Sequence, residues 1–389
     1  MATTSQVREP QLESTTDPIV SVAAATIRLP LPQPLQFGDY VISHREYVIA
    51  RARSRSGGQG YGFALTRDGA IAETIRRLLA PAYVGTEPGA VTTTWRLAQS
   101  VSPAALSSGV GYRALSVVDL AVWDLVAKLA GLPVHALLGG SAVGPMAVAI
   151  VGFPPTQGGE GVAAEVGALR KAGWRRFKLP IAATLELTRE RLSAAIEAGG
   201  PDSLVMFDVA WAWPDVATGV RYVEELGLEL GWVEDPFVPR EAAEIAELRQ
   251  RISLPVAYGD DQGGSYYPEA LLDKDAVDVL RIDATCMGGA SVFGRLLDKA
   301  DARGVRCAPH IFPHFHVPLL GGFGRDDVQV EWAIRGNGVD PLSDILEQPV
   351  IVEGGRMAPF PDRAGFGIDL DLAWLADQEV DDPDGIFRP

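Results

Sequence analysis

The sequence lacks the features that identify several classes of protein. Its 389 residues include only two cysteines, Cys286 and Cys307, and no CxxC motif, so neither a disulfide framework nor a cysteine-bound zinc site is expected. No basic segment followed by an apolar stretch stands at the N-terminus, and no apolar run reaches about 18 residues. We therefore expect neither a signal peptide nor a membrane span, and we predict a cytoplasmic protein.

Positive charge is also scarce. Lys and Arg total 34 against 50 Asp and Glu, which leaves a formal net charge of −16 at pH 7. Nucleic acids and anionic membranes bind proteins through Lys and Arg, so this balance argues against both as partners. It does not argue against a small anionic substrate, because one local cation or metal ion can reverse the field inside a pocket.

The chain has enough apolar content, 47%, to bury a large core. Residues 1–17 are polar and rich in Thr and Ser, and we expect them to form a flexible arm. Alternating runs such as YVIARARS, followed by stretches of helical periodicity such as ALSVVDLAVWDLVAKLAGLP, predict an α+β domain over residues 18–143. The last segment, residues 350–389, is expected to fold back on this domain.

Between residues 144 and 349, short β-rich runs alternate with amphipathic helical segments. In those segments apolar residues recur three or four positions apart, as at Ala242, Ile245 and Leu248. Eight such units predict parallel strands covered by helices in a (β/α)8 TIM barrel. An open doubly wound sheet is the alternative, although no GxGxxG motif follows any of the runs. The predicted strands cover residues 148–153, 175–180, 204–208, 230–235, 255–260, 277–283, 305–310 and 328–332.

Ionisable residues stand at the predicted carboxyl ends of these strands, where a barrel houses its active site. Asp208, Glu234 and Asp260 follow one another at equal intervals of 26 residues. Three carboxylates at one mouth repel each other unless a cation joins them, and oxygen-only ligands favour a hard ion such as Mg²⁺. The other ionisable strand-end residues are Lys178, Asp283, His310 and Glu331.

Each of these acids also has an ordinary structural interpretation. An aspartate that follows a strand often caps the next helix or faces outward, and we prefer these interpretations for Asp235 and Asp261. The matched spacing of Asp208, Glu234 and Asp260 is what favours a metal site for those three.

A set of motifs resembles those of the enolase superfamily, specifically its mandelate racemase-like group. They are ALSVVDLAVWDLVAKLAGLPVHALLGG before the barrel, FDVAWAW, WVEDP, AYGD, VLRIDATCMGG and CAPH within it, and GFGIDLD near the end. The resemblance extends over about residues 27–371. It implies a modified TIM barrel with an α+β capping domain, one Mg²⁺, and abstraction of the proton next to a carboxylate.

The resemblance also implies roles for individual residues. Asp208, Glu234 and Asp260 match the metal ligands, although Asp260 stands where much of the family has Glu. Asp283 and His310 match an Asp–His pair in which the histidine is the base. A histidine suits that role because its ordinary pKa is near neutrality, and the aspartate would orient the ring and stabilise its charged form.

Two further residues match groups that contact the substrate carboxylate in the family. Lys178 matches the lysine, and Glu331 matches an acid that could donate a hydrogen bond only when protonated, which would require a raised pKa. The racemase of the family carries a second basic lysine, but this chain has Pro180 there, which cannot accept a proton. Ala210 replaces a common Asn, whereas Trp213 matches a common aromatic residue and is a candidate for substrate binding.

With one clear base, the simplest reaction is the elimination of water. His310 would remove the α-proton and then protonate the departing 3-hydroxyl on the same face, as in acid-sugar dehydratases of the group. We therefore predict a dehydratase that acts on a small 2,3-dihydroxy carboxylate, in a homo-oligomer as is common in this group. A racemase or epimerase with another base, such as Lys178, and a catalytically silent sugar-acid-binding protein are the alternatives.

Substrate identity should depend on residues that cover the mouth of the barrel. Family analogy points to residues 31–46 and to the turn at residues 61–69. In addition, two histidines follow the seventh predicted strand, and their two-residue spacing would put them on one face of an extended segment; they could equally be ordinary loop histidines. The polar candidates for contacts with a sugar acid are Tyr40, His44, Arg45, His314 and His316.

Overall fold

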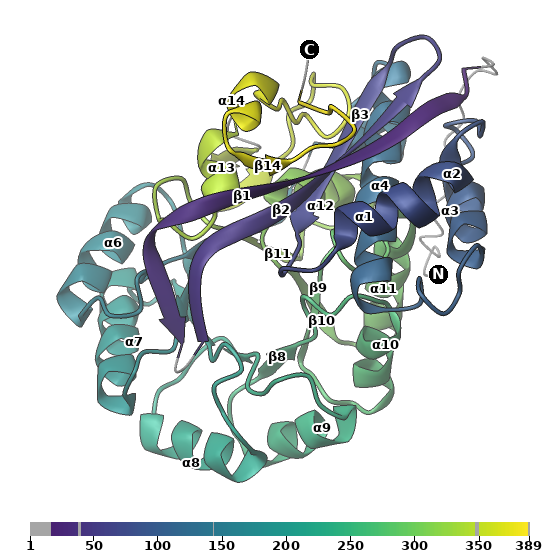
Figure 1. Cartoon of the computed structure of the whole chain (residues 1–389). Coiled ribbons are helices and arrows are strands. Elements are labelled where there is room, and N and C mark those ends of the chain that lie inside the picture. Colours follow the sequence, from purple (N-terminus) through teal and green to yellow (C-terminus); the bar gives the residue numbers. More distant parts are fainter. Residues whose placement is uncertain (1–16, 38–39, 143, 347–349, 388–389) are drawn as a thin grey trace.

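The structure is a computed structural model that describes residues 17–37, 40–142, 144–346 and 350–387. The predicted arm over residues 1–17 therefore lies, except for Asp17, outside the described residues. Figure 1 shows an elongated sheet with short helices beside it, placed across the mouth of a barrel of strands and outer helices.

The sheet is built from the N-terminal strands of the chain. Strands β1 (Ile19–Phe37), β2 (Tyr40–Ser54) and β3 (Gln59–Leu65) are antiparallel neighbours. The short strand β14 (Glu379–Asp381) joins the other edge of β1, pairing with Thr26–Arg28. One sheet therefore combines the first and the last strand of the described chain.

Helix α4 packs against this sheet at close range. Cβ atoms added at Gly60 and Gly62 of β3 would lie 2.2 Å from the backbone oxygen of Ala121 and 2.4 Å from that of Val117, so only glycine allows this approach. The helical elements of this region are α1 (Ile71–Thr74), a π-helical turn (Ile75–Leu79), α2 (Ala80–Tyr83), α3 (Val91–Ser100), α4 (Gly109–Leu129) and α5 (Val134–Leu137).

The barrel consists of eight parallel strands within residues 144–346. Seven lie within predicted runs, and β4 overlaps its run but begins two residues earlier, at Met146. Parallel pairing runs in the order β11-β4-β5-β6-β7-β8-β9-β10, and β10 contacts β11, so the strands close on themselves. The predicted TIM barrel is confirmed and the open sheet is excluded. The strands are β4 (Met146–Ile150), β5 (Arg176–Pro180), β6 (Leu204–Asp208), β7 (Val233–Glu234), β8 (Val256–Tyr258), β9 (Val279–Ile282), β10 (Arg306–Pro309) and β11 (Gln329–Trp332).

Helices surround the barrel, as Figure 1 shows. Local sequence sets their ends: the Asp215 carboxylate accepts a hydrogen bond from Thr218 N at 2.7 Å at the start of α8, and Gly227 with φ 62° ends that helix. None of the helices in the described ranges is long and apolar enough to cross a membrane. The barrel helices are α6 (Gly159–Lys171), α7 (Leu185–Gly199), α8 (Val216–Leu226), α9 (Ala242–Arg251), α10 (Tyr266–Asp273), α11 (Ala290–Ala302) and α12 (Pro313–Gly322).

An apolar layer fills the barrel beneath its mouth. Side chains from five strands and from the residue just before β7 form one buried cluster, separate from the larger core between strands and helices: Val148, Met206, Trp232, Ala257, Val279 and Ala308. Because strand side chains alternate between faces, the residues two positions after Met206, Trp232 and Ala308 also point inward. The strand periodicity therefore directs a second, polar layer to the carboxyl ends of the strands.

The four-stranded sheet and helices α1–α5 are together called the sheet region. Hydrogen bonds to α4 attach this region to the barrel. Asp119 accepts from Ser291 N at 3.0 Å and from its Oγ at 2.6 Å, and Ser116 Oγ accepts from Gly288 N at 2.7 Å. A Cβ at Gly289, where φ is 74°, would lie 2.3 Å from an Asp119 oxygen. The double glycine of CMGG thus brings the loop after β9 against α4.

The C-terminal segment crosses back to the sheet region. Asp124 of α4 accepts hydrogen bonds at 2.9 Å from both Phe366 N and Tyr61 N, and so joins this segment to β3. The elements after the barrel are α13 (Pro341–Ile345), β12 (Ile351–Glu353), β13 (Arg356–Ala358), α14 (Leu372–Ala376) and β14.

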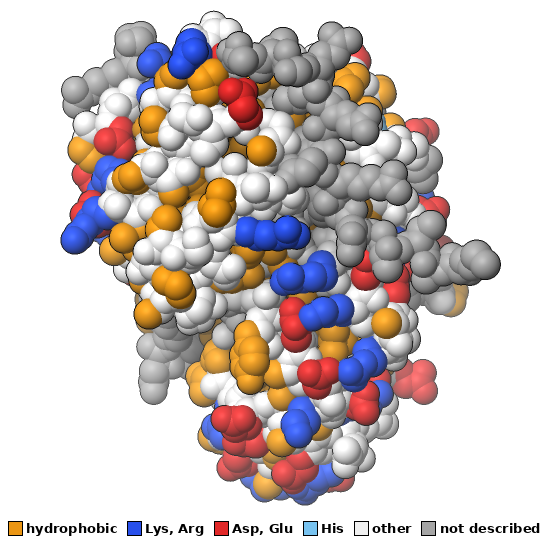
Figure 2. Space-filling view, turned by 90° about the vertical axis from the view of Figure 1, so that its right-hand side faces the viewer, with side chains coloured by type: hydrophobic (Ala, Val, Ile, Leu, Met, Phe, Trp, Pro, Cys, Tyr) orange, Lys and Arg blue, Asp and Glu red, His pale blue; other side chains and the backbone are white. Residues whose placement is uncertain are grey.

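The surface carries charges of both signs. Figure 2 shows Lys and Arg intermixed with Asp and Glu over the lower part of one face, toward the barrel end, and scattered apolar side chains above them. The most exposed apolar residues on the helices of the sheet region are Val84, Leu97 and Val101.

Candidate active site

A cavity lies where the sheet region covers the carboxyl ends of the barrel strands. Arg45 and Tyr47 of β2 and Arg67 of the turn after β3 form one wall. Strand-end residues form the opposite wall: Lys178, Asp208, Glu234, Asp260 and His310. The structure thus gathers the predicted metal ligands, the predicted base and Lys178 around one space.

Lys178 is the centre of a buried charge cluster. Its Nζ lies 3.1 Å from Asp208 Oδ2, 2.5 Å from Glu234 Oε1 and 2.8 Å from Glu331 Oε1. Burial opposes its charge, but Asp208, Glu234 and Glu331 together raise the pKa of Lys178 well above its ordinary value. The ammonium form of Lys178 is therefore strongly favoured over the neutral amine that a base requires.

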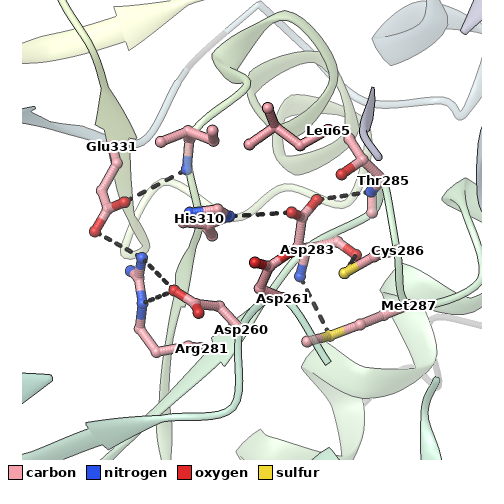
Figure 3. A network of polar contacts seen from close by, with 12 residues as sticks. Leu65, Asp260, Asp261, Arg281, Asp283, Thr285, Cys286, Met287, His310 and Glu331 are labelled. Atoms are coloured by element: carbon pink, nitrogen blue, oxygen red, sulfur yellow. Dashed lines mark hydrogen bonds and ion pairs between the residues drawn. The ribbon is translucent and has the colours of Figure 1, made fainter. Parts of the chain in front are cut away.

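Arg281 is a second cation in this cluster, and the sequence analysis missed it. Its guanidinium lies 3.2 Å from Asp260 Oδ2, 2.6 Å from Glu331 Oε1 and 3.4 Å from Glu234 Oε1, with no exposure to solvent. Figure 3 shows it between Asp260 and Glu331. The signal was present in VLRID, because Arg281 precedes Asp283 by two positions and so shares its inward face.

Glu331 has a different ionisation state from the one predicted. Burial alone would raise its pKa, but the neighbouring charges of Arg281 and Lys178 lower the pKa of Glu331 to about 2. The prediction of a raised pKa and a protonated acid is therefore wrong, because it did not include the two cations. The other Glu331 oxygen accepts a long hydrogen bond, 3.4 Å, from Ile311 N.

His310 and Asp283 form the predicted pair. His310 Nδ1 lies 3.2 Å from Asp283 Oδ2, as Figure 3 shows. Although burial opposes the charge of Asp283, the hydrogen bond from His310 and the nearby ring of His316 hold its pKa below the ordinary range. Since the carboxylate is ionised, Nδ1 donates the hydrogen bond, and Nε2 is the nitrogen that can accept a proton.

The same negative surroundings favour the protonated form of His310. Burial lowers its pKa, but the charge of Asp260, the hydrogen bond to Asp283 and the charges of Asp283 and Asp261 outweigh burial, so the pKa of His310 is raised from its ordinary value. Once the ring has taken a proton, this environment stabilises the imidazolium.

Contrary to the prediction, His314 and His316 do not share one face of an extended segment. They lie in helix α12, where a two-residue step points side chains in nearly opposite directions. His316 accepts from Ala284 N at 2.9 Å and donates to Ile311 O at 2.7 Å, so it fixes the loops beside Asp283 and His310. His314 packs edge-on against Phe63 with ring centroids 5.4 Å apart.

His314 is also isolated from hydrogen-bonding groups. Among the described residues neither of its ring nitrogens has a partner, and the side chain is 1% exposed. Burial therefore lowers the pKa of His314 to about 3. It lies in the apolar contact between the barrel and the sheet region, away from the residues that line the cavity.

The remaining substrate-contact candidates have different positions. Arg45 lines the cavity, whereas His44 faces away from it toward Asp68, 3.3 Å distant. The side chain of Tyr40 lies outside the described residues. Trp213 packs beside Phe207 and Tyr222 away from the cavity lining, while Trp211 contributes to that lining.

Asp235 and Asp261 neither cap helices nor face outward, contrary to the preferred interpretations. The residues at the N-caps of α9 and α10 are Glu241 and Ser265. Asp235 is buried and lines the cavity. The Asp261 side chain is 5% exposed and is held by cations from the sheet region rather than by helix termini.

The donor chemistry of the site fits Mg²⁺. Asp208, Glu234 and Asp260 come from the ends of three adjacent strands and offer only oxygen. Burial raises the pKa of Glu234 to about 7, and burial with the charges of Asp260 and Glu234 raises the pKa of Asp235 well above its ordinary value. A divalent cation would relieve this excess of negative charge.

The side chains are nevertheless turned toward protein cations. Within the described residues, no three His, Cys, Asp or Glu side chains converge closely enough to hold a metal ion. Asp208 faces Lys178, Asp260 faces Arg281, and Glu234 faces both. Lys178 and Arg281 thus neutralise part of the charge that the metal would otherwise neutralise.

Protein-family models match both regions of the chain. A family model described as the mandelate racemase / muconate lactonizing enzyme N-terminal domain matches residues 20–139. A second, described as enolase C-terminal domain-like, matches residues 161–374. Together they span the sheet region and the barrel.

Similar proteins include two kinds of enzyme. L-talarate/galactarate dehydratase from Salmonella typhimurium is 27% identical over 333 residues, 83% of this chain and 80% of that protein. N-succinyl-L-Arg/Lys racemase from Bacillus cereus is 24% identical over 320 residues, 78% of this chain and 83% of that protein. The solved structure of L-talarate dehydratase from Polaromonas sp. JS666 with Mg and L-glucarate has a TM-score of 0.81 at 25% identity, covering 94% of this chain and 98% of that one.

Proposed function

Because the chain belongs to the enolase superfamily, in its mandelate racemase / muconate lactonizing enzyme group, we propose that it is a Mg²⁺-dependent acid-sugar dehydratase. It converts a 2,3-dihydroxy carboxylate to a 2-keto-3-deoxy acid. The observation that carries the proposal is the imidazole–carboxylate pair of His310 with Asp283, whose imidazole lines one cavity with Lys178 and the strand-end acids. The dehydratases among the similar proteins support it.

His310 is proposed to carry both proton transfers. Its Nε2 takes the proton from C2, and Asp283 stabilises the resulting imidazolium through Nδ1. The same nitrogen then returns the proton to the 3-hydroxyl, which leaves as water. The enol that remains tautomerises to the keto acid, so the overall change is the loss of one water molecule.

Binding of the substrate carboxylate is proposed for Lys178, which lines the cavity, with Arg281 buried behind it as a second positive charge. Lys178 and Arg281 hold positive charge in a buried setting, where it stabilises the negative charge that develops on the carboxylate as the α-proton leaves. Glu331 is ionised and fixes both cations. Mg²⁺, held by Asp208, Glu234 and Asp260, would supply further stabilisation of that charge.

Two features favour elimination over racemisation. Pro180 stands where the racemase has its second lysine, and Lys178 is held as a cation by three carboxylates. Inversion at C2 needs a base on the face opposite His310, and neither residue can be that base. We further propose that the enzyme acts in the cytoplasm as a homo-oligomer.

The test uses purified protein, Mg²⁺ and a panel of acid sugars in D₂O. A dehydratase releases a keto acid that semicarbazide detects, and His310→Asn lowers the rate by at least about 100-fold because the base is lost. His44→Asn, which changes a histidine outside the cavity lining, is the matched control and keeps the wild-type rate. Labelled and inverted substrate without keto acid would instead identify a racemase and overturn the proposal.

A further inference from the structure

A cationic cluster lies on the side of the cavity formed by the sheet region. Asp261, three residues after the end of β8, forms ion pairs with the guanidinium of Arg67 and, at 2.6 Å, with that of Arg113. One carboxylate thus serves two guanidinium groups. Because each arginine carries one positive charge, the group of three has a net charge of +1.

The different burial of the three side chains decides which of them can present the positive charge to a ligand. The side chains of Asp261 and Arg113 are 5% and 7% exposed, whereas that of Arg67 is 29% exposed and lines the cavity. Among the described residues, Asp261 is the ion-pair partner of Arg67. Arg67 is therefore the member of the cluster that presents the excess positive charge to the cavity.

The backbone fixes Arg67 in that position. Arg67 and Asp68 have φ values of 52° and 57°, and Asp261 has φ 55°, a conformation that non-glycine residues adopt at an energetic cost. Arg113 also donates to the Leu65 carbonyl at 3.3 Å and to the Asp261 carbonyl at 3.0 Å, which holds both loops together. The cluster is preorganised by two loops and helix α4, and it does not depend on a flexible side chain alone.

We propose that Arg67, held by Asp261 and Arg113, binds a second carboxylate at the far end of the substrate, so that the enzyme prefers dicarboxylic acid sugars over monocarboxylic ones. This inference rests on the proposed dehydratase function and deepens it. Lys178, in the barrel, lines the cavity and is the cation proposed to bind the carboxylate next to the reacting carbon. Arg67, on the opposite wall, supplies a separate cation for the other end of the chain, and a guanidinium suits a carboxylate because two N–H groups can donate to it in parallel.

The experiment compares each aldaric acid with the aldonic acid of the same configuration, for example galactarate with galactonate, as substrates with saturating Mg²⁺. The wild type is expected to favour the diacid in kcat/KM. Arg67→Met lowers kcat/KM for the diacid by about 10- to 100-fold, the range for a lost charged hydrogen bond, and leaves the monoacid within about threefold. Arg67→Lys, which keeps the charge but not the paired donors, retains part of the preference. Arg53→Gln, an exposed arginine of β2, is the matched control and keeps the wild-type ratio.

A binding measurement separates this role from a purely structural one. In the His310→Asn background, calorimetry gives dissociation constants for both ligands without turnover, and Arg67→Met should weaken only the diacid. Equal losses for both ligands would mean that Arg67 merely holds the sheet region in place and would overturn the proposal, as would a wild-type preference for the monoacid. If no acid sugar of either kind forms a keto acid, the proposed function itself fails.

Discussion

At the scale of the residue, the site combines two groups that titrate near neutrality, His310 and Glu234, with groups that are held in fixed charge states. His310 has the raised pKa of a base that must lose a proton before it can act, while Lys178, Arg281 and Glu331 keep their charges. The pH dependence of the reaction therefore reports on His310 and Glu234, and a variant of Asp283, the partner of His310, identifies the contribution of the histidine.

The first prediction concerns that pH dependence. A base works only when deprotonated, so kcat/KM should rise with pH through a value above 6.5, the ordinary pKa of histidine. Asp283→Asn removes the hydrogen bond to a charged partner, so the rising limb should move to lower pH, and kcat should fall by about 100-fold or more because the ring loses its orientation. A pH–rate profile of both proteins checks this. An unmoved limb would show that His310 is not the titrating base.

The second prediction concerns Arg281 and Mg²⁺. Arg281→Gln removes a cation that faces Asp260 and Glu234, so Mg²⁺ should bind about 10-fold more tightly because repulsion is lost. Without metal the variant should be less stable by about 3–5 kcal/mol, since buried carboxylates lose a partner. Calorimetric titration with MgCl₂ and denaturant unfolding measure the two effects. Arg249→Gln, which breaks a surface ion pair with Asp278, is the control, and a weaker Mg²⁺ affinity in Arg281→Gln would contradict the prediction.

At the scale of the element, helix α12 shows where sequence periodicity was insufficient. The segment PHFHVPLLGG contains two prolines and two glycines, residues that usually indicate a loop, yet Pro313 occupies the first turn and the helix is buried on nearly all sides. Tertiary burial overrides the local signal. The interpretation of His314 and His316 as cavity residues depended on an extended segment, and it fails for that reason.

The third prediction follows from the burial of His314 in this helix. His314→Phe should stabilise the protein by about 1–3 kcal/mol, because it removes an unpartnered polar group and keeps the edge contact with Phe63. The gain should increase as pH falls. The unfolded chain binds a proton at His314 below about pH 6.5, while the folded protein does so only near pH 3, so the wild type loses stability across that interval. Denaturant unfolding at several pH values measures this, with His44→Phe as control; an equal gain at every pH would contradict the assignment.

The fourth prediction compares the two ends of helix α11. Gly289→Ala should destabilise by about 3 kcal/mol or more, because the new methyl group meets Asp119 and φ is positive. Gly304→Ala, also at positive φ (67°) but with nothing within 4 Å among the described residues, should lose only about 1–2 kcal/mol. Thermal or denaturant unfolding provides both values. Equal losses would show that the contact with α4 does not matter.

Much of the site could be predicted because strand ends in a barrel converge. The positions of Asp208, Glu234, Asp260, His310 and Lys178 in one cavity depend only on which residues end a parallel strand.

What could not be predicted depends on contacts between distant parts of the chain. The charge of Glu331 is set by Arg281 and Lys178 from two other strands, and the role of Asp261 is set by Arg67 and Arg113 from the sheet region. No local pattern encodes such contacts. The predicted boundaries at residues 17, 143 and 349 stay predictions.

At the scale of the whole molecule, two regions of the chain jointly enclose the cavity. Tyr47 of β2 donates a hydrogen bond to Asp340 of the loop after β11, and Arg45 donates to the neighbouring Val339 carbonyl at 3.2 Å. On another side, Asp261 links the barrel to Arg67 and Arg113. Substrate specificity and the relative placement of the two regions are therefore physically coupled.

The fifth prediction tests that coupling. Asp261→Asn leaves two guanidinium groups without a counter-charge, one of them buried, and should lower the free energy of unfolding by about 3–5 kcal/mol. The Arg67→Met, Asp261→Asn double variant should regain part of this loss, because one uncompensated charge is gone. Denaturant unfolding of the two variants decides it. A double variant no more stable than Asp261→Asn alone would show that the charges are independent.

The pairing of β14 with β1 has a consequence for biosynthesis. The edge of β1 at residues 26–28 cannot be covered until residues 379–381 have left the ribosome, so a nascent chain carries an open strand edge through almost the entire duration of translation. An uncovered edge can recruit strands from other chains. The sheet is therefore completed late in synthesis, and a ribosome-associated chaperone that shields the β1–β2 hairpin should raise the yield of folded protein.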